Sequence, residues 1–214
     1  MMKNRDKLFF FDFDGTIVNS MRHYLSYYNS YARENKKPVL TEGDFQKLRT
    51  EPYNEVRKKL GLGLVEAYLL DRKLKREVYK NPHRVQLTPG IKEVFQEIQQ
   101  NDNLIYIISS NSKQNITKVL HAHNINKIEK IIHTFRAFNK TYFLRKLLHE
   151  HQNYKHAFLI SDEYKDIIAA NKLGIISIAV TWGANNFNHK LDITPTFIVD
   201  KPQEILSTIQ NLHL

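Results

Sequence analysis

Short apolar runs recur along the chain, and they are separated by segments in which apolar residues are spaced as in helices. The first run, KLFFFDF at 7–13, is rich in aromatic residues, which suits a strand buried on both faces of a parallel sheet. Five later runs also predict strands, at 103–110, 130–135, 156–162, 175–182 and 196–199. The pattern therefore predicts six strands.

Between several of these strands, apolar positions recur every three or four residues, which is the period of an amphipathic helix. Such segments lie at 90–101, 113–124 and 140–151. Because strands and helices alternate after residue 89, the sequence predicts an α/β fold with a parallel sheet covered on both faces. The expected core is a Rossmann-like arrangement of three layers.

Residues 20–88 interrupt this alternation and contain no convincing strand. Helical patterns cover 20–37, 41–49, 51–61 and 65–81 instead. The first of them carries an aromatic stripe, formed by Tyr24, Tyr27, Tyr28 and Tyr31. Such a stripe is more typical of packing within a helical bundle than of a face that recognises a substrate.

The chain length fits two units of unequal size. A chain of 214 residues suits one large domain or a core domain with a smaller insert. The motif TPG at 88–90 marks the return from the helical segment to the alternating pattern. We therefore expect a core formed by 1–19 and 89–214, with an all-helical cap at 20–88 inserted after the first strand.

The composition excludes several classes of protein. With 42% hydrophobic and 25% charged residues, the chain has the make-up of an ordinary globular protein. Its apolar runs are all far shorter than the roughly 20 residues that span a bilayer, and the N-terminal segment makes a poor signal peptide. The absence of cysteine excludes disulfides, thiolate metal sites and cysteine nucleophiles. We expect a cytoplasmic protein that does not enter a membrane.

The net charge of +10 is concentrated in the predicted cap. Residues 20–88 hold 15 basic and 8 acidic side chains. A basic surface attracts anions of any kind, including nucleic acid. For most of these lysines, however, a solvated face that aids solubility is an equally good explanation.

Side chains able to bind or react follow the ends of four predicted strands. In chain order they are Asp12 and Asp14, then Ser109, Ser110 and Asn111, then Lys140, and finally Asp162, Glu163 and Asp166. Because the carboxyl ends of parallel strands share one edge of an open α/β sheet, these groups should gather at one rim. For Ser110 and Asn111, a role in a turn or a helix cap explains the position as well as phosphate contact does.

Asp12 and Asp14 should lie on the same side of the extended chain, roughly 7 Å apart. Two carboxylates at that distance repel each other, so a cation is expected near them, and Asp162 can supply a further oxygen. Ligands that are all oxygen atoms suit Mg²⁺ better than zinc. Gly15 would allow a sharp turn directly after the pair. The sequence thus predicts a magnesium site.

The segment DFDGT at 12–16 resembles the first signature of the haloacid dehalogenase-like hydrolase superfamily, and in particular its phosphoglycolate-phosphatase-like branch. The resemblance implies that Asp12 is the nucleophile and Asp14 the general acid and base. Asp14 argues against a dehalogenase, because displacing a halide requires no proton on the leaving group.

The remaining signatures of the superfamily have counterparts in the expected order. Ser109 in IISSNS is similar to the second signature, Lys140 in FNKTYFLRKLL to the third, and SDEYKD at 161–166 to the acidic fourth. The chain departs from the usual pattern at Ser161, Asn19 and Asn139. Ser161 and Asn139 stand where relatives usually have glycine, and Asn19 stands in place of a common aspartate. None of these changes removes a catalytic group, and the change at Ser161, next to Asp162, bears on the rate more than on the mechanism.

The resemblance implies a Mg²⁺-dependent phosphatase that acts on a small anionic phosphomonoester, such as phosphoglycolate or another phosphorylated metabolite, through an aspartyl-phosphate intermediate. The expected roles are a metal site with Asp12, Asp162 and Asp14 (through its backbone carbonyl), phosphoryl contacts from Ser109 and Lys140, substrate contacts from Thr16, Ser110 and Asn111, and supporting positions for Glu163 and Asp166. The oligomeric state cannot be read from the sequence.

Three alternatives remain open at this point. A phosphomutase would use the same residues if a second substrate hydroxyl reacted in place of water. The basic cap would also suit a nucleic-acid-binding protein or a phosphatase acting on nucleic-acid ends, and binding of that kind should weaken steeply with salt. We expect neither nucleic-acid role to be the main one, because the basic residues lie in short runs within amphipathic helices.

Overall fold

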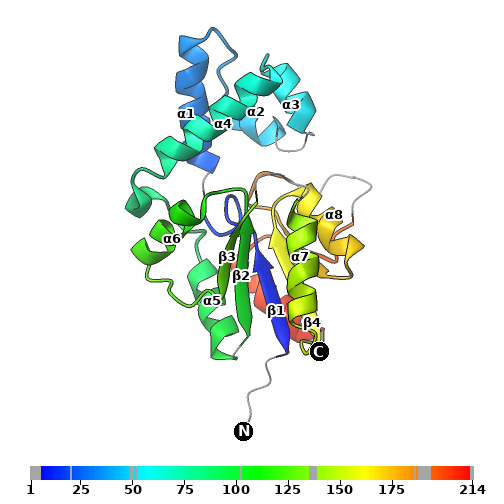
Figure 1. Cartoon of the computed structure of the whole chain (residues 1–214). Helices are drawn as coiled ribbons and strands as arrows, with labels where there is room; N and C mark the ends of the chain where they lie inside the picture. Colours follow the sequence, from blue (N-terminus) through cyan, green and yellow to red (C-terminus); the bar gives the residue numbers. More distant parts are fainter. Residues whose placement is uncertain are drawn as a thin grey trace.

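The centre of the structure is one sheet in which all neighbouring strands are parallel, with the order β3-β2-β1-β4-β5-β6 (Figure 1). The computed structural model describes residues 6–19, 21–48, 51, 53–101, 103–134, 139–185, 187 and 194–212. Its strands are β1 (Lys7–Phe11), β2 (Leu104–Ser109), β3 (Lys130–His133), β4 (His156–Ser161), β5 (Ile176–Val180) and β6 (Phe197–Val199). All six expected strands are therefore confirmed, although residue 135, the expected end of the third, lies outside the described residues.

The central strand, β1, is buried on both faces because its side chains alternate between two apolar layers. Phe9 and Phe11 belong to one layer, and Leu8 and Phe10 belong to the other. Phe9 stacks on Phe158 of β4, with ring centroids 5.1 Å apart. The aromatic run thus fixes β1 in the middle of the sheet, between β2 and β4.

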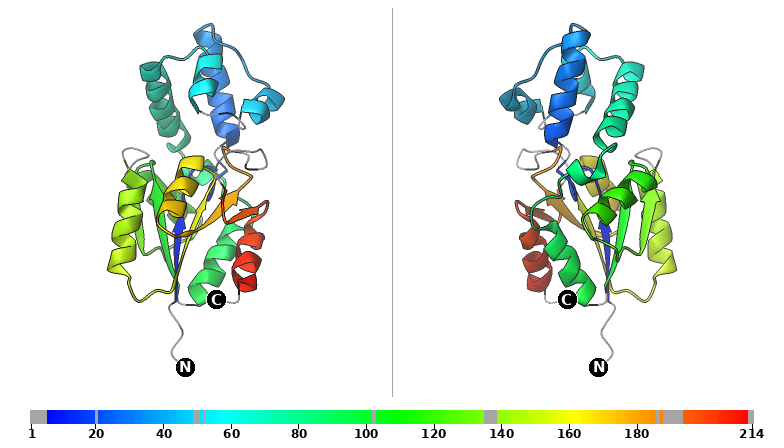
Figure 2. Two further views of the ribbon diagram at one scale, coloured as in Figure 1. Left: turned by 90° about the vertical axis from the view of Figure 1, so that its right-hand side faces the viewer. Right: turned by 90° about the vertical axis from the view of Figure 1, so that its left-hand side faces the viewer.

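Helices cover both faces of the sheet and give the core three layers. They are α5 (Ile91–Gln100), α6 (Lys113–Ala122), α7 (Asn139–Glu150), α8 (Tyr164–Lys172) and α9 (Pro202–Asn211). Apolar residues of α5, α6 and α9 share one buried cluster with the sheet, whereas those of α7 and α8 lie in the other. Figure 2 shows α7 and α5 on opposite sides of the strands. The expected Rossmann-like core is confirmed.

The helix α9 was not predicted from the sequence pattern. Pro202 stands in its first turn, and the Glu204 carboxylate accepts a hydrogen bond from the Lys201 backbone N–H at 3.2 Å. Ile205 and Ile209 are buried one helical turn apart and pack against the sheet. Proline followed by an apolar pair at this spacing is a recognisable, though short, helix signal.

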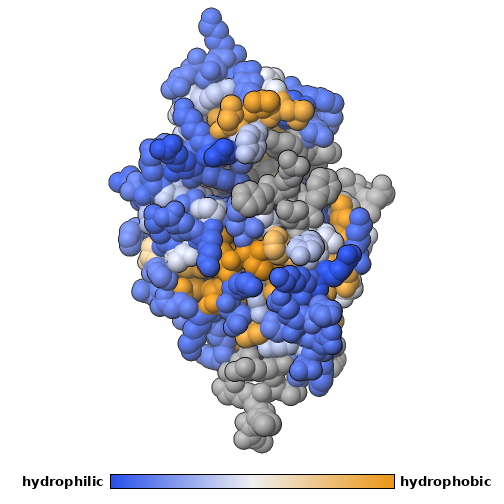
Figure 3. Space-filling model, viewed as in Figure 1, coloured by the Kyte–Doolittle hydropathy of each residue, from blue (hydrophilic) through white to orange (hydrophobic). Residues whose placement is uncertain are grey.

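The segment between β1 and α5 is helical, as expected for a cap. It contains α1 (Met21–Glu34), α2 (Glu42–Leu48), α3 (Tyr53–Lys59), α4 (Leu64–Val78) and the short 3₁₀ helix η1 (Pro82–Arg84). In Figure 1 the four α-helices lie beyond the carboxyl ends of the strands. They enclose their own apolar cluster, which includes Tyr28, Leu60, Leu62 and Leu70. On the face seen in Figure 3, hydrophilic residues cover most of the described surface.

The two chain segments that join cap and core run side by side. The Asn19 N–H donates to the Gln86 carbonyl at 2.9 Å, and the Thr88 N–H donates to the Ile17 carbonyl at 2.8 Å. Val18 and Leu87 form an antiparallel bridge between them. This paired connection, which we call the neck, agrees with a division near residues 19 and 88. The expected boundaries themselves stay a prediction, and Ser20, the expected first cap residue, lies outside the described residues.

Because α5 packs against the central strand through Phe95, shortening that side chain should destabilise the protein strongly. Phe95 is 1% exposed, and its ring lies 4.8 Å from that of Phe11. Phe95→Ala should lower the free energy of unfolding by about 3–5 kcal/mol. Tyr142→Ala, at a position 62% exposed on α7, should change it by less than about 0.5 kcal/mol. Urea denaturation of both variants provides the measurement, and equal losses would contradict the assignment of Phe95 to the core.

Candidate active site

Asp12 lies at the carboxyl end of the central strand and is almost fully buried. Its backbone N–H still donates to the Ile160 carbonyl of β4 at 3.0 Å, which fixes the residue beside the sheet. The Asp12 Oδ1 atom accepts the Phe13 N–H at 2.8 Å and lies 3.2 Å from Lys140 Nζ. A buried carboxylate is thus held in one orientation by a backbone donor and by a cation.

Lys140 joins Asp12 to a second buried carboxylate, that of Asp166. Its ammonium group forms an ion pair with Asp166 Oδ2, and the Ser161 hydroxyl donates to the same oxygen at 2.6 Å. Burial alone would lower the pKa of Lys140, but the charges of Asp12 and Asp166 outweigh it and raise that pKa. Lys140 therefore stays positively charged. Ser161, where the superfamily pattern has glycine, supports this network, and its Oγ also accepts the Glu163 N–H at 3.1 Å.

Asp162 lies in a close-fitting cradle formed by the loops after β1 and β5. The Thr16 hydroxyl donates to its Oδ1 at 2.9 Å, and the Ala184 N–H donates to its Oδ2 at 2.6 Å. A Cβ at Gly15 or Gly183 would overlap the Asp162 side chain, so both positions require glycine. Gly15 also has a φ of +79°, which confirms the expected sharp turn. Burial, together with the negative charge of Asp12, raises the pKa of Asp162 to about 7.

The Asp14 carboxylate is bonded both by cap residues and by the turn after β2. Its Oδ2 accepts a hydrogen bond from Asn111 Nδ2 at 3.0 Å. Its Oδ1 accepts from the hydroxyl of Tyr24 at 3.3 Å and from that of Tyr79. Burial raises the pKa of Asp14, although the positive charge of Lys75 and the Tyr79 hydrogen bond act in the opposite direction. A carboxyl with a raised pKa is suited to carry and release a proton.

The residues after β2 form a tight turn directly beside Asp14. The Asn111 N–H donates to Ser109 Oγ at 3.2 Å, and both residues are buried. The Asn111 Oδ1 accepts from the Ser112 N–H at 2.8 Å, so this residue serves the turn as well as Asp14. Ser110 instead receives a hydrogen bond at 3.3 Å from Lys75 of the cap. The expected roles of these residues and of Thr16 toward a substrate stay predictions.

Three carboxylates come close enough together to share one cation. Within the described part of the chain, oxygens of Asp12, Glu163 and Asp166 all lie within 4.8 Å of one another. Asp166 Oδ1 is buried and, among the described residues, has no hydrogen-bond partner. A buried oxygen in that state is costly unless a ligand reaches it, so these residues fit a hard cation such as Mg²⁺.

This grouping differs in part from the set expected to hold the metal. Asp12 is common to both, and Asp162 lies close enough for the charge of Asp12 to raise its pKa. The Asp14 carboxylate is not in the group, which leaves only its backbone for such a role. Glu163 and Asp166, expected in supporting positions, lie nearer to Asp12 than anticipated.

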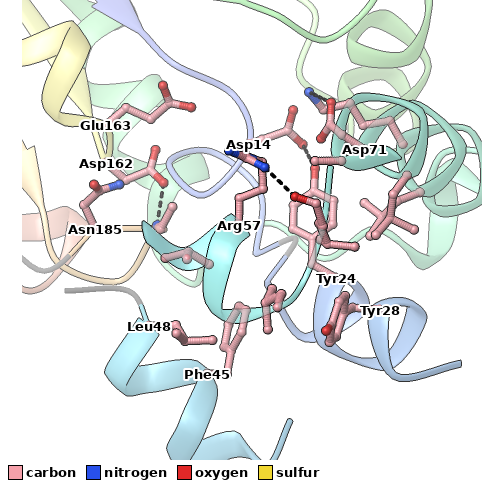
Figure 4. Close-up of a pocket in the computed structure, with 18 of the residues that line it drawn as sticks. Asp14, Tyr24, Tyr28, Phe45, Leu48, Arg57, Asp71, Asp162, Glu163 and Asn185 are labelled. Atoms are coloured by element: carbon pink, nitrogen blue, oxygen red, sulfur yellow. Dashed lines mark hydrogen bonds and ion pairs between the residues drawn. The ribbon is translucent and has the colours of Figure 1, made fainter. Parts of the chain in front are cut away.

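A cavity of about 380 Å³ opens between these groups and the cap. The core contributes Asp12, Asp14, Ser109, Asp162 and Glu163 to its wall. In Figure 4, Asp162 and Glu163 lie on one side of the cavity, opposite side chains of α1 and α2, and Arg57 lies between them. The reactive groups therefore face a space whose far wall belongs to the cap.

Sequence reasoning did not find the cap residues that reach the core. Tyr79 and Lys75 contact Asp14 and Ser110, and Tyr24, assigned only to an aromatic stripe, also bonds Asp14. Lys75 lies within the basic run RKLKR, which has the pattern of any solvated helix. The tyrosine stripe offered a weak signal, because a buried hydroxyl normally needs a partner.

Comparison with known proteins agrees with this geometry. The fold and the site define an α/β protein whose carboxylates gather at the carboxyl edge of a parallel sheet. The chain belongs to the haloacid dehalogenase-like hydrolase family, whose family model matches residues 9–180. The resemblance seen in the sequence is thereby confirmed.

Relatives match over nearly their whole length. A phosphoglycolate phosphatase of Synechococcus elongatus is 26% identical over 204 residues, which cover 94% of this chain and 96% of that protein. A phosphoglycolate phosphatase of Vibrio parahaemolyticus is 22% identical over 221 aligned positions, covering 95% and 96%. A haloacid dehalogenase-like family hydrolase from Streptococcus pneumoniae has the same fold, with a TM-score of 0.76, 22% identity and coverage of 98% and 100%.

These findings confirm the expected enzyme class, a hydrolase of the phosphatase type within this family. The acidic cluster around Asp12 agrees with the divalent metal that the sequence analysis expected. No helix in the described part of the chain is long and apolar enough to cross a bilayer.

The cradle around Asp162 predicts a sensitive position at Gly183. Gly183→Ala would place a methyl group on the Asp162 side chain and push it out of position. Affinity for Mg²⁺, measured by titration calorimetry, should fall about 10–100-fold, the usual effect of disturbing the groups that orient a metal site. Gly43→Ala is the matched control, because the nearest atom to its new Cβ is Thr41 Oγ1 at 3.7 Å. Unchanged affinity in Gly183→Ala would contradict the prediction.

Proposed function

We propose that the protein is a Mg²⁺-dependent phosphatase that hydrolyses a small phosphomonoester through an aspartyl-phosphate intermediate on Asp12. One observation carries the proposal: the buried Asp12 carboxylate is fixed by Lys140 at 3.2 Å, borders the acidic cluster and opens onto the cavity. A carboxylate oriented in this way is equipped to attack an electrophilic phosphorus atom.

In the first step, an oxygen of Asp12 attacks phosphorus, and the bond to the substrate's ester oxygen breaks. The departing oxygen takes a proton from the Asp14 carboxyl, whose pKa burial raises. Lys140 and Ser109 would bind the phosphoryl oxygens, whose negative charge then faces a buried ammonium group.

In the second step, water attacks the phosphorus of the aspartyl-phosphate. Asp14, now ionised, accepts a proton from that water, and the bond between phosphorus and the Asp12 oxygen breaks to release phosphate. Both protonation states of Asp14 are therefore used in turn. Its bonds to Asn111 and the cap tyrosines keep the carboxyl in place through the cycle.

The residues that would hold Mg²⁺ are Asp12, Asp162 and the backbone carbonyl of Asp14, with Glu163 and Asp166 close to Asp12. When bound, the ion would neutralise negative charge on the phosphoryl group. The unpartnered Asp166 Oδ1 and the raised pKa of Asp162 both support a cation at this position, since a positive charge would stabilise these ionised carboxylates.

The division into a core of 1–19 and 89–214 and a cap of 20–88 has a function in this scheme. A helical cap over the site would exclude water while Asp12 reacts. The cavity between the two parts, with walls drawn from both, supports this division. The named activity of the relatives, phosphoglycolate hydrolysis, enters here as one candidate among small phosphorylated metabolites.

A main role in nucleic-acid binding is less well supported. Several cap lysines are engaged in ion pairs with neighbouring acids, which lowers the positive charge available to phosphates. The pairs are Lys37–Glu66, Lys58–Glu55, Lys59–Glu51, Lys75–Asp71 and Lys80–Glu77. The basic excess of the cap is therefore partly balanced locally.

Removing the nucleophile should abolish catalysis. Asp12→Asn should lower the rate of phosphate release from p-nitrophenyl phosphate by at least about 10³-fold, because the amide cannot replace the carboxylate that forms the intermediate. EDTA should remove activity from the wild-type enzyme, and added Mg²⁺ should restore it. Equal release in every arm would overturn the proposed function. Transfer from a bisphosphate to a second hydroxyl without free phosphate would indicate a mutase instead.

The raised pKa of Asp14 predicts a pH dependence that varies with the leaving group. Because the protonated form is the acid, kcat/KM for an alkyl phosphate should fall as pH rises through this pKa. For a p-nitrophenyl ester, whose leaving group requires little protonation, kcat/KM should not show this fall at high pH, which we call the alkaline limb of the profile. The Tyr79 hydrogen bond lowers the Asp14 pKa, so Tyr79→Phe should move the limb to higher pH.

The control for this pH experiment is Tyr68→Phe, at an exposed position on α4. It should leave the pH profile for the alkyl phosphate unchanged. If Asp14→Asn kept the same fall of kcat/KM for the alkyl phosphate at high pH, another group would have to supply the proton, and the assignment of Asp14 would be wrong.

A further inference from the structure

The cap side of the cavity is lined mostly by apolar side chains. The cap residues in its wall without charge are Tyr24, Tyr28, Leu40, Phe45, Leu48, Val56, Leu60, Leu62, Ala67, Leu70 and Leu74. They come from all four cap helices and the loops between them. The polar groups of the core thus occupy one end of the cavity, and an apolar chamber occupies the other.

Most charged groups in the chamber wall are already paired. Lys75 Nζ lies 3.1 Å from Asp71 and donates to Ser110, and Glu51 lies 2.6 Å from Lys59 Nζ. A substrate would have to break these pairs to use their charges. They therefore add little to the recognition of a polar organic group.

Arg57 is the exception among the charged cap residues in the wall. One of its terminal nitrogens, Nη1, donates to the Leu62 carbonyl. Its Nε is buried and, among the described residues, has no hydrogen-bond partner. A buried donor in that state is costly to leave unpaired, which points to an acceptor that arrives with a ligand.

We propose, on the basis of the phosphatase function above, that the substrate is a phosphomonoester whose organic part is largely apolar, aliphatic or aromatic, and carries one hydrogen-bond acceptor for Arg57. The phosphate would lie at Asp12, and the organic part would fill the chamber formed by the cap. At about 380 Å³ the cavity falls within the range of about 300–1,000 Å³ that is typical of small-molecule sites. A compact polyanion such as phosphoglycolate would leave most of this apolar wall uncovered.

The length of the alkyl group in the substrate provides the first test. The measurement is kcat/KM for ethyl, butyl, hexyl and octyl phosphate, with phosphoglycolate alongside. Each methylene buried against the chamber should raise kcat/KM about fourfold until the cavity is full, and phosphoglycolate should be a poorer substrate than hexyl phosphate. A flat or falling series, or a preference for phosphoglycolate, overturns this inference and leaves the phosphatase function standing. No phosphate release from any compound overturns both.

Two variants locate the preference in the chamber. Leu48→Gln and Phe45→Gln alter partly exposed wall residues on α2, so folding should survive. Each should reduce the octyl-to-ethyl ratio of kcat/KM about tenfold or more. The matched control is Leu69→Gln, a leucine 55% exposed on α4 and absent from the wall, which should leave the ratio unchanged. Equal ratios in all three variants and the wild type overturn the inference.

The acceptor for Arg57 is tested separately. A 6-carboxyhexyl phosphate should be preferred to hexyl phosphate by the wild type, and Arg57→Met, which keeps an apolar stem, should lose that preference. Circular dichroism and thermal unfolding of Arg57→Met check that the cap remains folded. A wild type without preference, or a preference kept in Arg57→Met, overturns the assignment of Arg57.

Discussion

The structure depends on the neutralisation of several negative charges that are buried at one edge of a sheet. Asp12, Asp162 and Asp166 are all buried; burial raises the pKa of Asp162 and of Asp166, and the negative charge of Asp12 acts in the same direction on both. The described residues place one buried ammonium group, that of Lys140, between Asp12 and Asp166. One cation for three carboxylates leaves negative charge uncompensated, and this deficit is what makes the site a receptor for a metal ion.

The sheet order brings these charges together. β1 lies between β2 and β4, so the loops that follow the three strands are neighbours at the same edge. Asp12, Ser109 and Asp162 therefore converge, although they lie in three separate parts of the sequence. The phenylalanines of β1 fix the strand between two apolar layers, and the position of Asp12 follows from that packing.

The sequence predicted those features that depend on residues close together in the chain, and it missed those that depend on contacts between distant residues. The aromatic run of β1 and the acids that follow the strands are local patterns, and they predicted the sheet and the edge at which these acids gather. The contact of Tyr79 with Asp14 joins residues 65 positions apart, and nothing in the local pattern of α4 distinguishes that tyrosine. The nearness of Glu163 and Asp166 to Asp12 likewise depends on the conformation of a loop. The signal of α9, a proline in the first turn before Ile205 and Ile209, is also local, and α9 is as long as α5 and α6, so the sequence could have predicted this helix.

The bonds from Tyr24 and Tyr79 to Asp14 link the cap to the carboxyl that we propose as the acid and base of the reaction. If the cap swings about the neck, Tyr24 moves with it and Asp14 loses a donor that favours its ionised form, but solvent also reaches the carboxyl and relieves the burial that raises its pKa. Because burial is the largest cause of the raised pKa, Asp14 holds its proton more tightly when the cap covers the site. Closure over a substrate would thus prepare the proposed acid for the step in which it is needed.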